Sequence, residues 1–420
     1  MKRLWIINHY AQEPGAPGGT RHYSLARHLT QQGWRATVIA ASTELNTGRQ
    51  RLARNESRRI DVIDGVPFLW IRTPQYRGNG ASRLINMLVF SLRVLLPRMT
   101  RELDRPDVII GSSVHPFAAW SGAILARRFG VPFLFEVRDL WPQTLIDMGR
   151  LRAGAPFTRF LRWLERWLYR RADRIIVLLP NASNYIVPLG IPAEKIVWIP
   201  NGVELAEYPP PEPPAEKDAF VLMYFGAHGE ANGLDCVLRA MDELQRRPPQ
   251  RSVRLRLIGD GALKPALVQL ARELGLENIV FEDPVAKQAI PGLARDADGF
   301  VFNLIDAPVF KYGISSNKLF DFLAAGRPIV FSCSSSNNPV GEAGAGLTVP
   351  PGNPVVLADA IRSLIAMPGR QRDAMGQAGR RYVEDRHSFD VLGAQLAATL
   401  EQVQQPSNAK SARIEPSGYL

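Results

Sequence analysis

Short apolar segments alternate with longer amphipathic stretches along most of the chain. The short segments predict buried strands, and the stretches between them repeat apolar residues at helical spacing. The expected strands of the first half are Leu4–Asn8, Ala36–Ala41, Asp107–Gly111, Pro132–Val137, Arg174–Leu178 and Ile196–Ile199. Those of the second half are Ala219–Phe225, Val253–Ile258, Asn278–Phe281, Gly299–Asn303, Pro328–Phe331 and Gly346–Val349. This alternation predicts an α/β fold of two doubly wound, Rossmann-like domains with parallel sheets.

A proline-rich segment separates the two halves. The run YPPPEPPAEKD at Tyr208–Asp218 can continue neither a helix nor a sheet, so it predicts a stiff linker. Because 420 residues exceed one ordinary core, we expect two domains whose strand C-termini face a shared cleft. A final helix is expected to pack back on the first domain, before a polar, disordered tail. The expected segments are 1–205 and 219–385 for the domains, 206–218 for the linker, 386–403 for the helix and 404–420 for the tail.

The stretch KYGISSNKLFDFLAAGRPIV, residues 311–330, carries the clearest chemical signal. Ser315 or Ser316 can cap a helix, whose N-terminus presents free N–H groups and partial positive charge. Lys318 adds a full charge at that end, and the combination suits a phosphate. Asp321 lies one turn further on roughly the same face, where a carboxylate could bind ribose hydroxyls. The pair fits a sugar nucleotide, while a capped surface helix with a local ion pair remains the alternative.

Four other stretches of the second half bear on the same site. FGAHGEANGLD at Phe225–Asp235 contains three glycines and His228, and could wrap a phosphate. GDG at Gly259–Gly261 predicts a tight turn beside the cleft, and Phe281–Val285 could place backbone groups against a base. Asp296–Asp298 forms a DxD string, which can bind a divalent metal. Because it precedes a strand, at the wrong end for the cleft, we interpret it as turn chemistry.

The first half places polar loops after its expected strands. In PGAPGGT, Pro14–Thr20, the glycines Gly18 and Gly19 let the backbone approach a ligand at a helix N-terminus. The spacing is not GxGxxG, so a nicotinamide fingerprint is not supported. His115, in SSVHP, would lie at a strand C-terminus, where either a functional or a structural histidine is expected.

The next strand is followed by EVRDLWP, which offers Glu136, Arg138 and Asp139. An acid at this position could orient or deprotonate an acceptor hydroxyl. Alternatively, Arg138 and Asp139 form a structural ion pair. NGVE at Asn201–Glu204 predicts a turn at the end of the first half.

Charge is distributed unevenly between the halves. Residues 1–195 contain 29 Lys and Arg against 14 Asp and Glu, a net charge of +15, whereas the remainder carries −4. An excess of this kind points to a polyanionic partner, either nucleic acid or an anionic membrane. No apolar run is long enough to span a membrane, and the first apolar stretch is too short for a signal peptide. The distant Cys236 and Cys333 suggest neither a disulfide nor a zinc site, so a cytoplasmic location is expected.

Two helical stretches of the basic half interleave arginines with large apolar residues. They are Arg83–Arg101 and Phe157–Arg171. Arginine-rich amphipathic helices that contain tryptophan are typical of a protein that lies on a membrane surface. A helix that packs on the core with a solvated basic back is the alternative. The expected membrane-facing residues are Arg83, Arg93, Arg162, Trp163, Arg166 and Trp167.

Taken together, these motifs resemble the retaining glycosyltransferases of the GT-B fold, family 4. The resemblance covers most of the chain and is strongest for the bacterial branch that builds O-antigen, capsule or exopolysaccharide, including fucosaminyl (FucNAc) transferases. It rests on PGGT, SSVHP, EVRDLWP, NGV, FGxxGxxxGLD, GDG and SNKLFDFLAAGRPIV. It implies that the first domain holds the acceptor and the second a nucleotide-activated sugar, with uracil as the base. It also implies retention of anomeric configuration without a metal or other cofactor.

The resemblance assigns roles to individual residues. It implies catalytic roles for His115, Lys318, Asp321 and Asp139, and an acceptor side formed by Glu136, Arg138 and Asp139. The implied donor contacts are Gly18, Gly19, Gly226, His228, Gly259, Val285, Gly313, Ile314, Ser315, Ser316, Asn317, Lys318 and Asp321.

Two departures from the family pattern stand out. Asp321 corresponds to the second acid of the E-x7-E motif, but Gly313 occupies the position of the first. FGAHGEANG also lacks the usual basic pair after the first strand of the donor domain, so Lys318 is expected to supply that charge, with Lys311 or Arg138.

We therefore expect a metal-independent transferase at the inner membrane surface of a bacterium. It would move a sugar, N-acetylated and UDP-linked by resemblance, to a lipid-diphosphate-linked acceptor. A UDP-N-acetyl sugar 2-epimerase of the same fold is the alternative enzyme. A nucleic-acid-binding protein is suggested by the charge alone, since no recognised nucleic-acid module is present.

Overall fold

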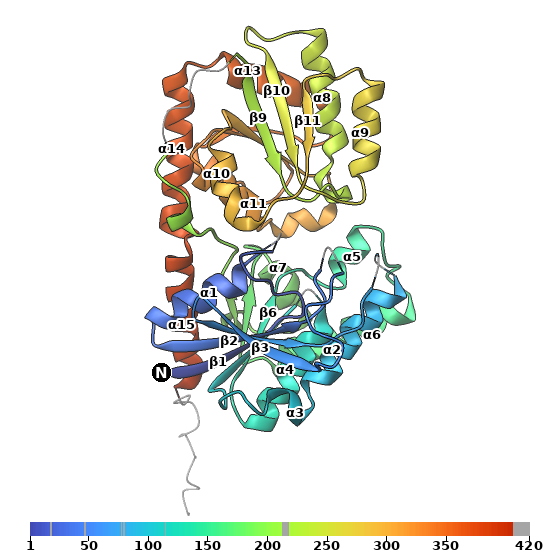
Figure 1. Ribbon diagram of the computed structural model, residues 1–420, viewed down its shortest axis with the longest axis vertical. Coiled ribbons are helices and arrows are strands. Elements are labelled where there is room, and N and C mark those ends of the chain that lie inside the picture. The colour runs from blue at the N-terminus through green and yellow to red at the C-terminus, as the bar shows by residue number, and fades with distance from the viewer. Residues whose placement is uncertain are drawn as a thin grey trace, which may run out of the picture.

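The computed structural model describes residues 1–16, 19–45, 48–76, 78, 80–113, 115–211 and 218–405. They form two α/β units, one above the other in Figure 1, each built around a sheet that is mainly parallel. This confirms the expected fold class of two doubly wound, Rossmann-like domains.

The N-terminal sheet has the strand order β3-β4-β2-β1-β5-β6-β7-β8 within the described residues. Every pair is parallel except β3 with β4. The strand order reverses between β1 and β5, so loops that follow these two strands lie at a topological switch point. The strands are β1 (Lys2–Ile7), β2 (Trp34–Ala41), β3 (Arg58–Ile63), β4 (Val66–Ile71), β5 (Val108–Ser112), β6 (Phe133–Val137), β7 (Arg174–Val177) and β8 (Ile196–Trp198).

Helices cover both faces of this sheet. They are α1 (Arg21–Gln31), α2 (Ala81–Val94), α3 (Pro97–Thr100), α4 (Pro116–Phe129), α5 (Gln143–Asp147), α6 (Pro156–Arg171) and α7 (Ser183–Ile186). One continuous helix over Arg83–Arg101 was expected, but α2 ends at Val94 and α3 begins at Pro97. The break has a local cause, because proline lacks an N–H and disfavours helical backbone in the residue before it.

The hairpin of β3 and β4 was not among the expected strands. Its turn is Asp64-Gly65, with φ of +47° and +83°, and Asp-Gly is a preferred dipeptide for a two-residue hairpin. The turn signal was therefore present in the sequence. The polar composition of β3, RRIDVI, obscured the strand because β3 is an edge strand that is only partly buried.

The C-terminal sheet is parallel, with the order β11-β10-β9-β12-β13-β14 among described strands. Its switch point lies between β9 and β12. The strands are β9 (Phe220–Phe225), β10 (Val253–Ile258), β11 (Ile279–Glu282), β12 (Gly299–Asn303), β13 (Ile329–Ser332) and β14 (Gly346–Val349). The helices are α8 (Leu234–Arg246), α9 (Lys264–Glu273), α10 (Ile290–Ala294), α11 (Asn317–Ala324), α12 (Pro339–Ala343), α13 (Pro354–Ala366), α14 (Gly369–Arg386) and α15 (Phe389–Gln404).

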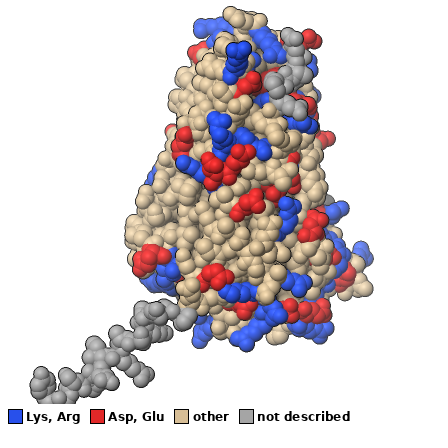
Figure 2. All heavy atoms as spheres, turned by 90° about the vertical axis from the view of Figure 1, so that its left-hand side faces the viewer, with Lys and Arg blue, Asp and Glu red and all other residues tan. Residues whose placement is uncertain are grey.

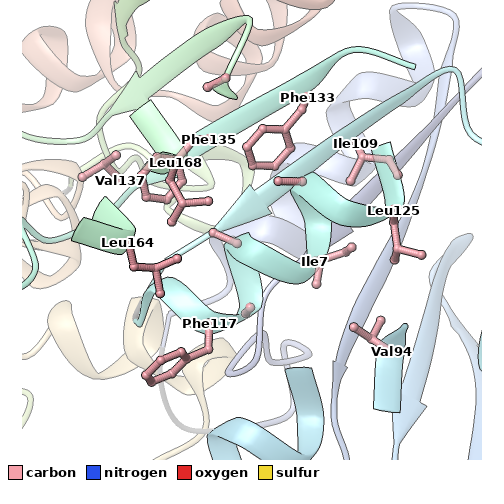
Figure 3. Close-up of a cluster of buried hydrophobic side chains, with 14 of the residues drawn as sticks. Ile7, Val94, Ile109, Phe117, Leu125, Phe133, Phe135, Val137, Leu164 and Leu168 are labelled. Atoms are coloured by element: carbon pink, nitrogen blue, oxygen red, sulfur yellow. The ribbon is translucent and has the colours of Figure 1, made fainter. Parts of the chain in front are cut away.

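Alternating side chains of the N-terminal strands meet α4 and α6 in a dry core. Figure 3 shows Phe133, Phe135 and Val137 of β6 beside Leu164 and Leu168 of α6. All five are nearly inaccessible to solvent, and each such side chain stabilises the fold by about 1.5–3 kcal/mol through burial. This packing fixes α6 with one face inward and the opposite face toward solvent.

The last helix crosses back to the N-terminal unit. In Figure 1, α14 runs beside the upper unit and α15 beside the lower one. Leu392, Leu396 and Leu400 of α15 are buried in the same core cluster as residues of β1 and β2. Where the chain crosses, the Val203 amide donates to the His387 carbonyl at 2.9 Å, and the Phe389 amide donates to the Val203 carbonyl at 3.2 Å. Two chain segments therefore connect the units side by side.

Part of the expected linker lies outside the described residues, at 212–217. The tail from residue 406 onward also lies outside them. The described start of the linker is packed rather than free, since Tyr208 is buried and donates a hydrogen bond to Asp321 at 2.9 Å.

Candidate functional site

The loops that follow β9 and β10 meet the start of α11. A Cβ atom on Gly259 would lie 2.0 Å from the Gly226 carbonyl oxygen, and one on Gly226 would lie 3.3 Å from Cδ of Lys318. Both glycines have φ near +145°, a conformation that side chains rarely tolerate. The structure therefore brings Gly226, Gly259 and Lys318 together, and glycine is required at the first two positions for this close approach.

The N-terminus of α11 differs in one detail from the sequence-based expectation. Ser316 is the N-cap residue, but neither its hydroxyl nor that of Ser315 caps the helix amides. The Ser315 hydroxyl instead accepts a hydrogen bond from the Asn201 amide at 2.8 Å. The first amides of α11 therefore have no side-chain cap, which leaves them available to a ligand.

Lys318 lies half-buried beneath the glycine loop. Its Nζ donates to the Tyr224 hydroxyl at 2.9 Å and to Asn232 Oδ1, and it lies 4.6 Å from the centre of the Tyr224 ring. No carboxylate in the described part of the chain is within ion-pair distance of it. Burial lowers the pKa of Lys318 to about 7. An ammonium held by neutral groups alone lacks a counter-ion, and a bound anion would supply one.

Asp321 makes other contacts than those expected from the sequence. It is buried, it binds Lys287 through both carboxylate oxygens, and it accepts the Tyr208 hydroxyl. It therefore forms no local ion pair with Lys318. A ribose at this position would have to share or displace the Lys287 contact.

Gly313 explains the missing first acid of the motif. Its φ is +97°, and a Cβ there would lie 2.6 Å from Cδ of Pro180 and 2.9 Å from Oδ1 of Asn337. Any side chain would therefore be both strained and obstructed. The next residue, Ile314, is fixed by hydrogen bonds of its amide and carbonyl to the Asn337 side chain, at 2.7 and 3.1 Å.

His228 and Val285 flank the glycine loop. His228 is fully buried, and both of its ring nitrogens lack a partner among the described residues. Burial, followed by the charge of Lys264, lowers its pKa to about 4, so the ring is neutral near pH 7. Val285 is half-buried at the edge of the aromatic cluster that includes Phe225.

The N-terminal unit contacts this site through Gly19. A Cβ on Gly19 would lie 2.7 Å from Nδ2 of Asn317, the first residue of α11. The neighbouring Gly18 lies outside the described residues. Of the two glycines expected at the donor site, Gly19 is therefore the one that the structure places beside α11.

His115 lies at the end of β5, as expected, and is completely buried. Neither ring nitrogen has a partner among the described residues, and the ring of His9 is 4.9 Å away. Burial, together with the nearby His9 and Arg83, places its pKa well below the ordinary value. The ring is therefore a neutral group that can donate from one nitrogen and accept at the other.

Glu136, which is expected on the acceptor side, is bound by other residues of the N-terminal unit. Arg21 Nε donates to Oε1 at 2.9 Å, while His22 at 2.7 Å and the Ser112 hydroxyl bind Oε2. Burial opposes ionisation, but the Arg21 and His22 contacts outweigh it and hold the pKa of Glu136 well below its ordinary value. A carboxylate held ionised by these contacts is a weaker base than an ordinary glutamate, which disfavours proton transfer from an acceptor hydroxyl to Glu136.

Asp139 and Arg138 lie beside Glu136 but differ from it in exposure. The Asp139 side chain is exposed, and Arg138 is half-buried. In the part of the chain that the structure describes, these two side chains do not form an ion pair with each other. Asp139 is therefore the acid after β6 that a substrate could reach.

Several contributing residues were missed by the sequence interpretation. They are Arg21, His22, Asn201, Tyr208, Tyr224, Asn232 and Lys287. Arg21 carried one usable signal, since it follows the glycine loop directly at a helix start. The others are separated along the chain from the groups they bind, so no local pattern marks them.

The two amphipathic helices present different surfaces. On α2, Arg83 bonds to the Tyr10 hydroxyl at 3.0 Å and Arg93 to the Arg72 carbonyl at 2.7 Å, so both arginines turn toward the protein. The large side chains exposed on α2 are apolar, namely Ile85, Leu88 and Leu92, and the exposed Leu96 follows the end of the helix.

The outer face of α6 combines arginines with aromatic rings. Trp163 is 58% exposed and stacks on the exposed Phe160. A hollow of about 370 Å³ lies along the helix, lined by Arg159, Arg162, Trp163, Arg166, Trp167 and Arg170. Among the described residues, the four arginines have no ion-pair or side-chain hydrogen-bond partner. In contrast, basic and acidic side chains are interspersed on the face shown in Figure 2.

The described residues offer neither a cluster typical of a metal site nor a membrane-spanning helix. They contain no cluster of three His, Cys, Asp or Glu side chains arranged to hold a metal ion. The acids of the DxD string have structural partners, since Asp296 pairs with Arg256 and Asp298 accepts the Val221 amide. No helix in the described ranges has both the length and the apolarity needed to cross a bilayer.

Comparison with known proteins agrees with this architecture. Residues 18–202 match the glycosyl transferase 4-like domain, and residues 219–367 match the glycosyl transferases group 1 domain. WcaI of Escherichia coli K12, named as a glycosyl transferase of colanic acid biosynthesis, is 23% identical over 76% of this chain and 81% of its own. A D-inositol 3-phosphate glycosyltransferase of Kineococcus radiotolerans is 26% identical over 92% of this chain and 90% of its own.

Among solved structures, HepE of Anabaena in complex with UDP-glucose superposes with a TM-score of 0.66 at 17% identity. The superposition covers 96% of this chain and all of that one. No comparison favours the epimerase or the nucleic-acid-binding alternative. The chain is a glycosyltransferase of the GT-B fold, built from a glycosyl transferase 4-like domain and a glycosyl transferases group 1 domain.

Proposed function

We propose that this enzyme transfers a sugar from a UDP-linked donor to a lipid-diphosphate-linked acceptor, with retention and without a metal. The observation that carries the proposal is Lys318, a half-buried ammonium held by neutral groups at the N-terminus of α11. A diphosphate there would meet one full positive charge, a helix dipole and uncapped amides. These groups stabilise the charge that develops on the leaving diphosphate, which is the role a divalent cation has in other transferases.

The donor base is assigned on two grounds. HepE, which shares the fold, was solved with UDP-glucose. The half-buried Val285, after β11, offers an apolar edge against which a planar base can pack. An N-acetylated amino sugar is the proposed transferred group, as the sequence resemblance implies.

Reaction chemistry is assigned to the side of the N-terminal unit. Asp139, the exposed acid after β6, is proposed to orient the acceptor hydroxyl. His115 is proposed to hydrogen-bond the transferred sugar, because its neutral ring has unpartnered nitrogens. The departing phosphate oxygen is proposed to take the hydroxyl proton on the same face, which gives retention.

A lipid-linked acceptor requires the enzyme to work at a membrane surface. The outer face of α6 supports this, because its arginines have no side-chain partner among the described residues while Trp163 and Phe160 are exposed. Guanidinium groups bind lipid phosphates, and indole rings favour the interfacial zone. The name of WcaI places that relative in colanic acid biosynthesis, so we propose a role in bacterial cell-surface polysaccharide assembly at the cytoplasmic face of the inner membrane.

Transfer is tested by incubating the enzyme with a panel of nucleotide sugars and polyprenyl-diphosphate-sugar acceptors. We expect incorporation from one UDP-sugar in the presence of a chelator, with no conversion of that donor in the absence of acceptor. Folded enzyme that binds no nucleotide sugar would contradict the proposal. Conversion of the donor alone would instead indicate the epimerase.

Membrane attachment is tested by charge reversal. Arg162→Glu with Arg166→Glu should abolish co-sedimentation with vesicles that contain phosphatidylglycerol. The matched control is Arg239→Glu with Arg254→Glu, an equal charge change at exposed positions of the C-terminal unit. If both double variants sediment like the wild type, the α6 face is not the attachment surface.

A further inference from the structure

Arg21 is a buried arginine that holds three separate parts of the N-terminal unit. Its side chain is 1% exposed. Nε donates to Glu136 Oε1 at 2.9 Å, Nη2 donates to the Ile199 carbonyl at 2.8 Å, and Nη1 donates to the Pro200 carbonyl. One guanidinium thus joins the start of α1, the end of β6 and the segment that leads into the C-terminal unit.

The segment held by Arg21 continues directly into the donor site. Asn201 follows Pro200, is nearly buried, and donates twice to Ser315 at the start of α11. Its amide binds the Ser315 hydroxyl at 2.8 Å, and its Nδ2 binds the Ser315 carbonyl at 2.6 Å. A displacement of the Pro200 carbonyl would therefore move the groups that hold Ser315.

The approach of Gly19 to Asn317 of α11 also depends on Arg21. Gly19, which touches Asn317, precedes Arg21 by two residues. Because Arg21 is the first residue of α1, the position of its backbone fixes where the glycine loop ends. Two of the N-terminal segments that approach the start of α11 are thus anchored by the same side chain, while a third, at Pro180 and Asn181, contacts Gly313 and Tyr312.

The burial of Arg21 indicates that it fixes the relative positions of chain segments, and that it adds little to the stability of the fold. A buried ion pair gains little net stability, since the loss of hydration of both ions offsets their attraction. The guanidinium fork, however, presents several donors in fixed directions, and the lysine ammonium cannot reproduce that arrangement. Arg21 therefore suits a role in which angles and distances between segments matter.

We propose that Arg21 is a positioning residue, which sets the two N-terminal contacts on the donor helix and so the placement of the donor relative to the N-terminal unit. This inference rests on the proposed function, in that α11 must hold the donor. Arg21 acts through Glu136, Pro200 and Asn201 and does not itself touch the donor.

The test compares Arg21→Lys with Arg58→Lys. The control arginine has a similar set of partners, because Arg58 binds Glu102 and the Met99 carbonyl. It differs in lying on the edge strand β3, away from the C-terminal unit. Lysine retains the charge that Glu136 requires, so the variant avoids an uncompensated buried carboxylate.

The first readout is hydrogen exchange, which requires no substrate. In Arg21→Lys we expect faster exchange only in peptides that cover 19–22, 199–203 and 315–320, with the wild-type rate in Arg58→Lys. Faster exchange throughout the N-terminal sheet would mean that Arg21 is only a structural anchor, and unchanged exchange would also overturn the proposal. Because this readout needs no activity, it tests the inference even if no donor is found.

The second readout is kinetic. In Arg21→Lys we expect the donor KM to rise about tenfold while the acceptor KM stays unchanged, and in Asn201→Ala a smaller rise of the same kind. Partial unfolding would instead lower kcat per total protein and leave the donor KM of the folded fraction unchanged, which would overturn the proposal. A wild-type enzyme that uses no nucleotide sugar would refute the proposed function and leave the exchange result to decide on Arg21.

Discussion

Gly19 of the N-terminal unit lies close to the side chain of Asn317 in α11. A Cβ on the glycine would be 2.7 Å from Nδ2 of Asn317. This contact joins a glycine loop that follows β1 to the helix that we assign to the donor. Because the opposing atom is the end of a side chain, a methyl group at this position would force either the Asn317 side chain or the glycine loop to move.

Gly19→Ala should therefore lower transfer, by about tenfold if the loop must retreat to relieve the contact. The φ of Gly19 is not in the left-handed region, so the expected effect comes from the contact and not from backbone strain. The double variant Gly19→Ala with Asn317→Ala should recover most of the activity, because Asn317→Ala removes the opposing amide and keeps the helix backbone. Initial rates at subsaturating donor measure both. Failure of the second substitution to restore activity would exclude a simple steric cause.

Lys318→Ala should lower kcat by about 10²-fold or more, because removal of a charge-stabilising donor typically costs this much. The substitution leaves Asp321 with its own partners, Lys287 and Tyr208, so the helix should remain in place. Single-turnover rates at saturating donor give the comparison, with Arg239→Ala, which removes an exposed cation of α8, as the control. Turnover close to the wild-type rate would remove Lys318 from the proposed role.

Donor binding should be linked to proton uptake at Lys318. In the enzyme without donor, burial lowers the pKa of Lys318 to about 7, so above pH 7 the Lys318 side chain is neutral in most molecules. A bound diphosphate favours the charged form and raises the pKa, so affinity should fall as pH rises above 7, by up to about tenfold per pH unit. Calorimetric titration of a UDP-sugar in buffers of different ionisation enthalpy measures the uptake. Lys318→Met should abolish it, and the same uptake in that variant would point to another group.

Glu165 should make stability depend on pH. Burial on the inner face of α6 raises its pKa from 4.5 to about 8, while the hydroxyls of Tyr169 and Tyr185 bind its two oxygens. The folded protein thus keeps a proton that the unfolded chain loses as pH rises above about 4.5. The free energy of unfolding should therefore decrease between about pH 4.5 and 8, by at most about 1.4 kcal/mol per pH unit.

Glu165→Gln removes this titration and retains an acceptor for the tyrosine hydroxyls. Its Tm advantage over the wild type should consequently grow between about pH 5 and pH 8, as measured by scanning calorimetry. Glu194→Gln, at an exposed position, is the control and should show no such trend. Parallel Tm curves for Glu165→Gln and the wild type would show that Glu165 is ionised in the folded protein.

The sequence predicted the strands that pair in parallel, apart from β4, because each of them contains a short apolar run. Val253–Ile258, Gly299–Asn303 and Gly346–Val349 have the expected bounds. Of the missed hairpin, the edge strand β3 buries little surface and keeps polar residues, whereas β4 is apolar and fully buried and was overlooked. Pro97 indicated a break in the helix, but the helical spacing of the apolar residues around it favoured one continuous helix.

Within the site, the sequence located the loops but not the partners of their side chains. The spacing of Lys318 and Asp321 suggested that both side chains lie on one face of the helix and bind the same sugar nucleotide. The fold instead directs Lys318 to Tyr224 and Asp321 to Lys287, because those partners come from other strands and loops. Glu136 shows the same limit, since its saturation by Arg21 depends on where β6 and α1 meet.

The sequence by itself determined the alternation of strands and helices, the position of the N-terminus of α11 beside Lys318, and the glycines that a close backbone approach requires. These properties depend on residues that are neighbours along the chain, so local spacing and backbone freedom encode them. Only the tertiary structure decided that a side chain at Gly313 would be obstructed, that Glu136 binds Arg21 and His22, and that Arg21 binds the carbonyls of Ile199 and Pro200. Each of these depends on groups that are distant in sequence, and their distances are set when the two sheets and the crossing segments pack together.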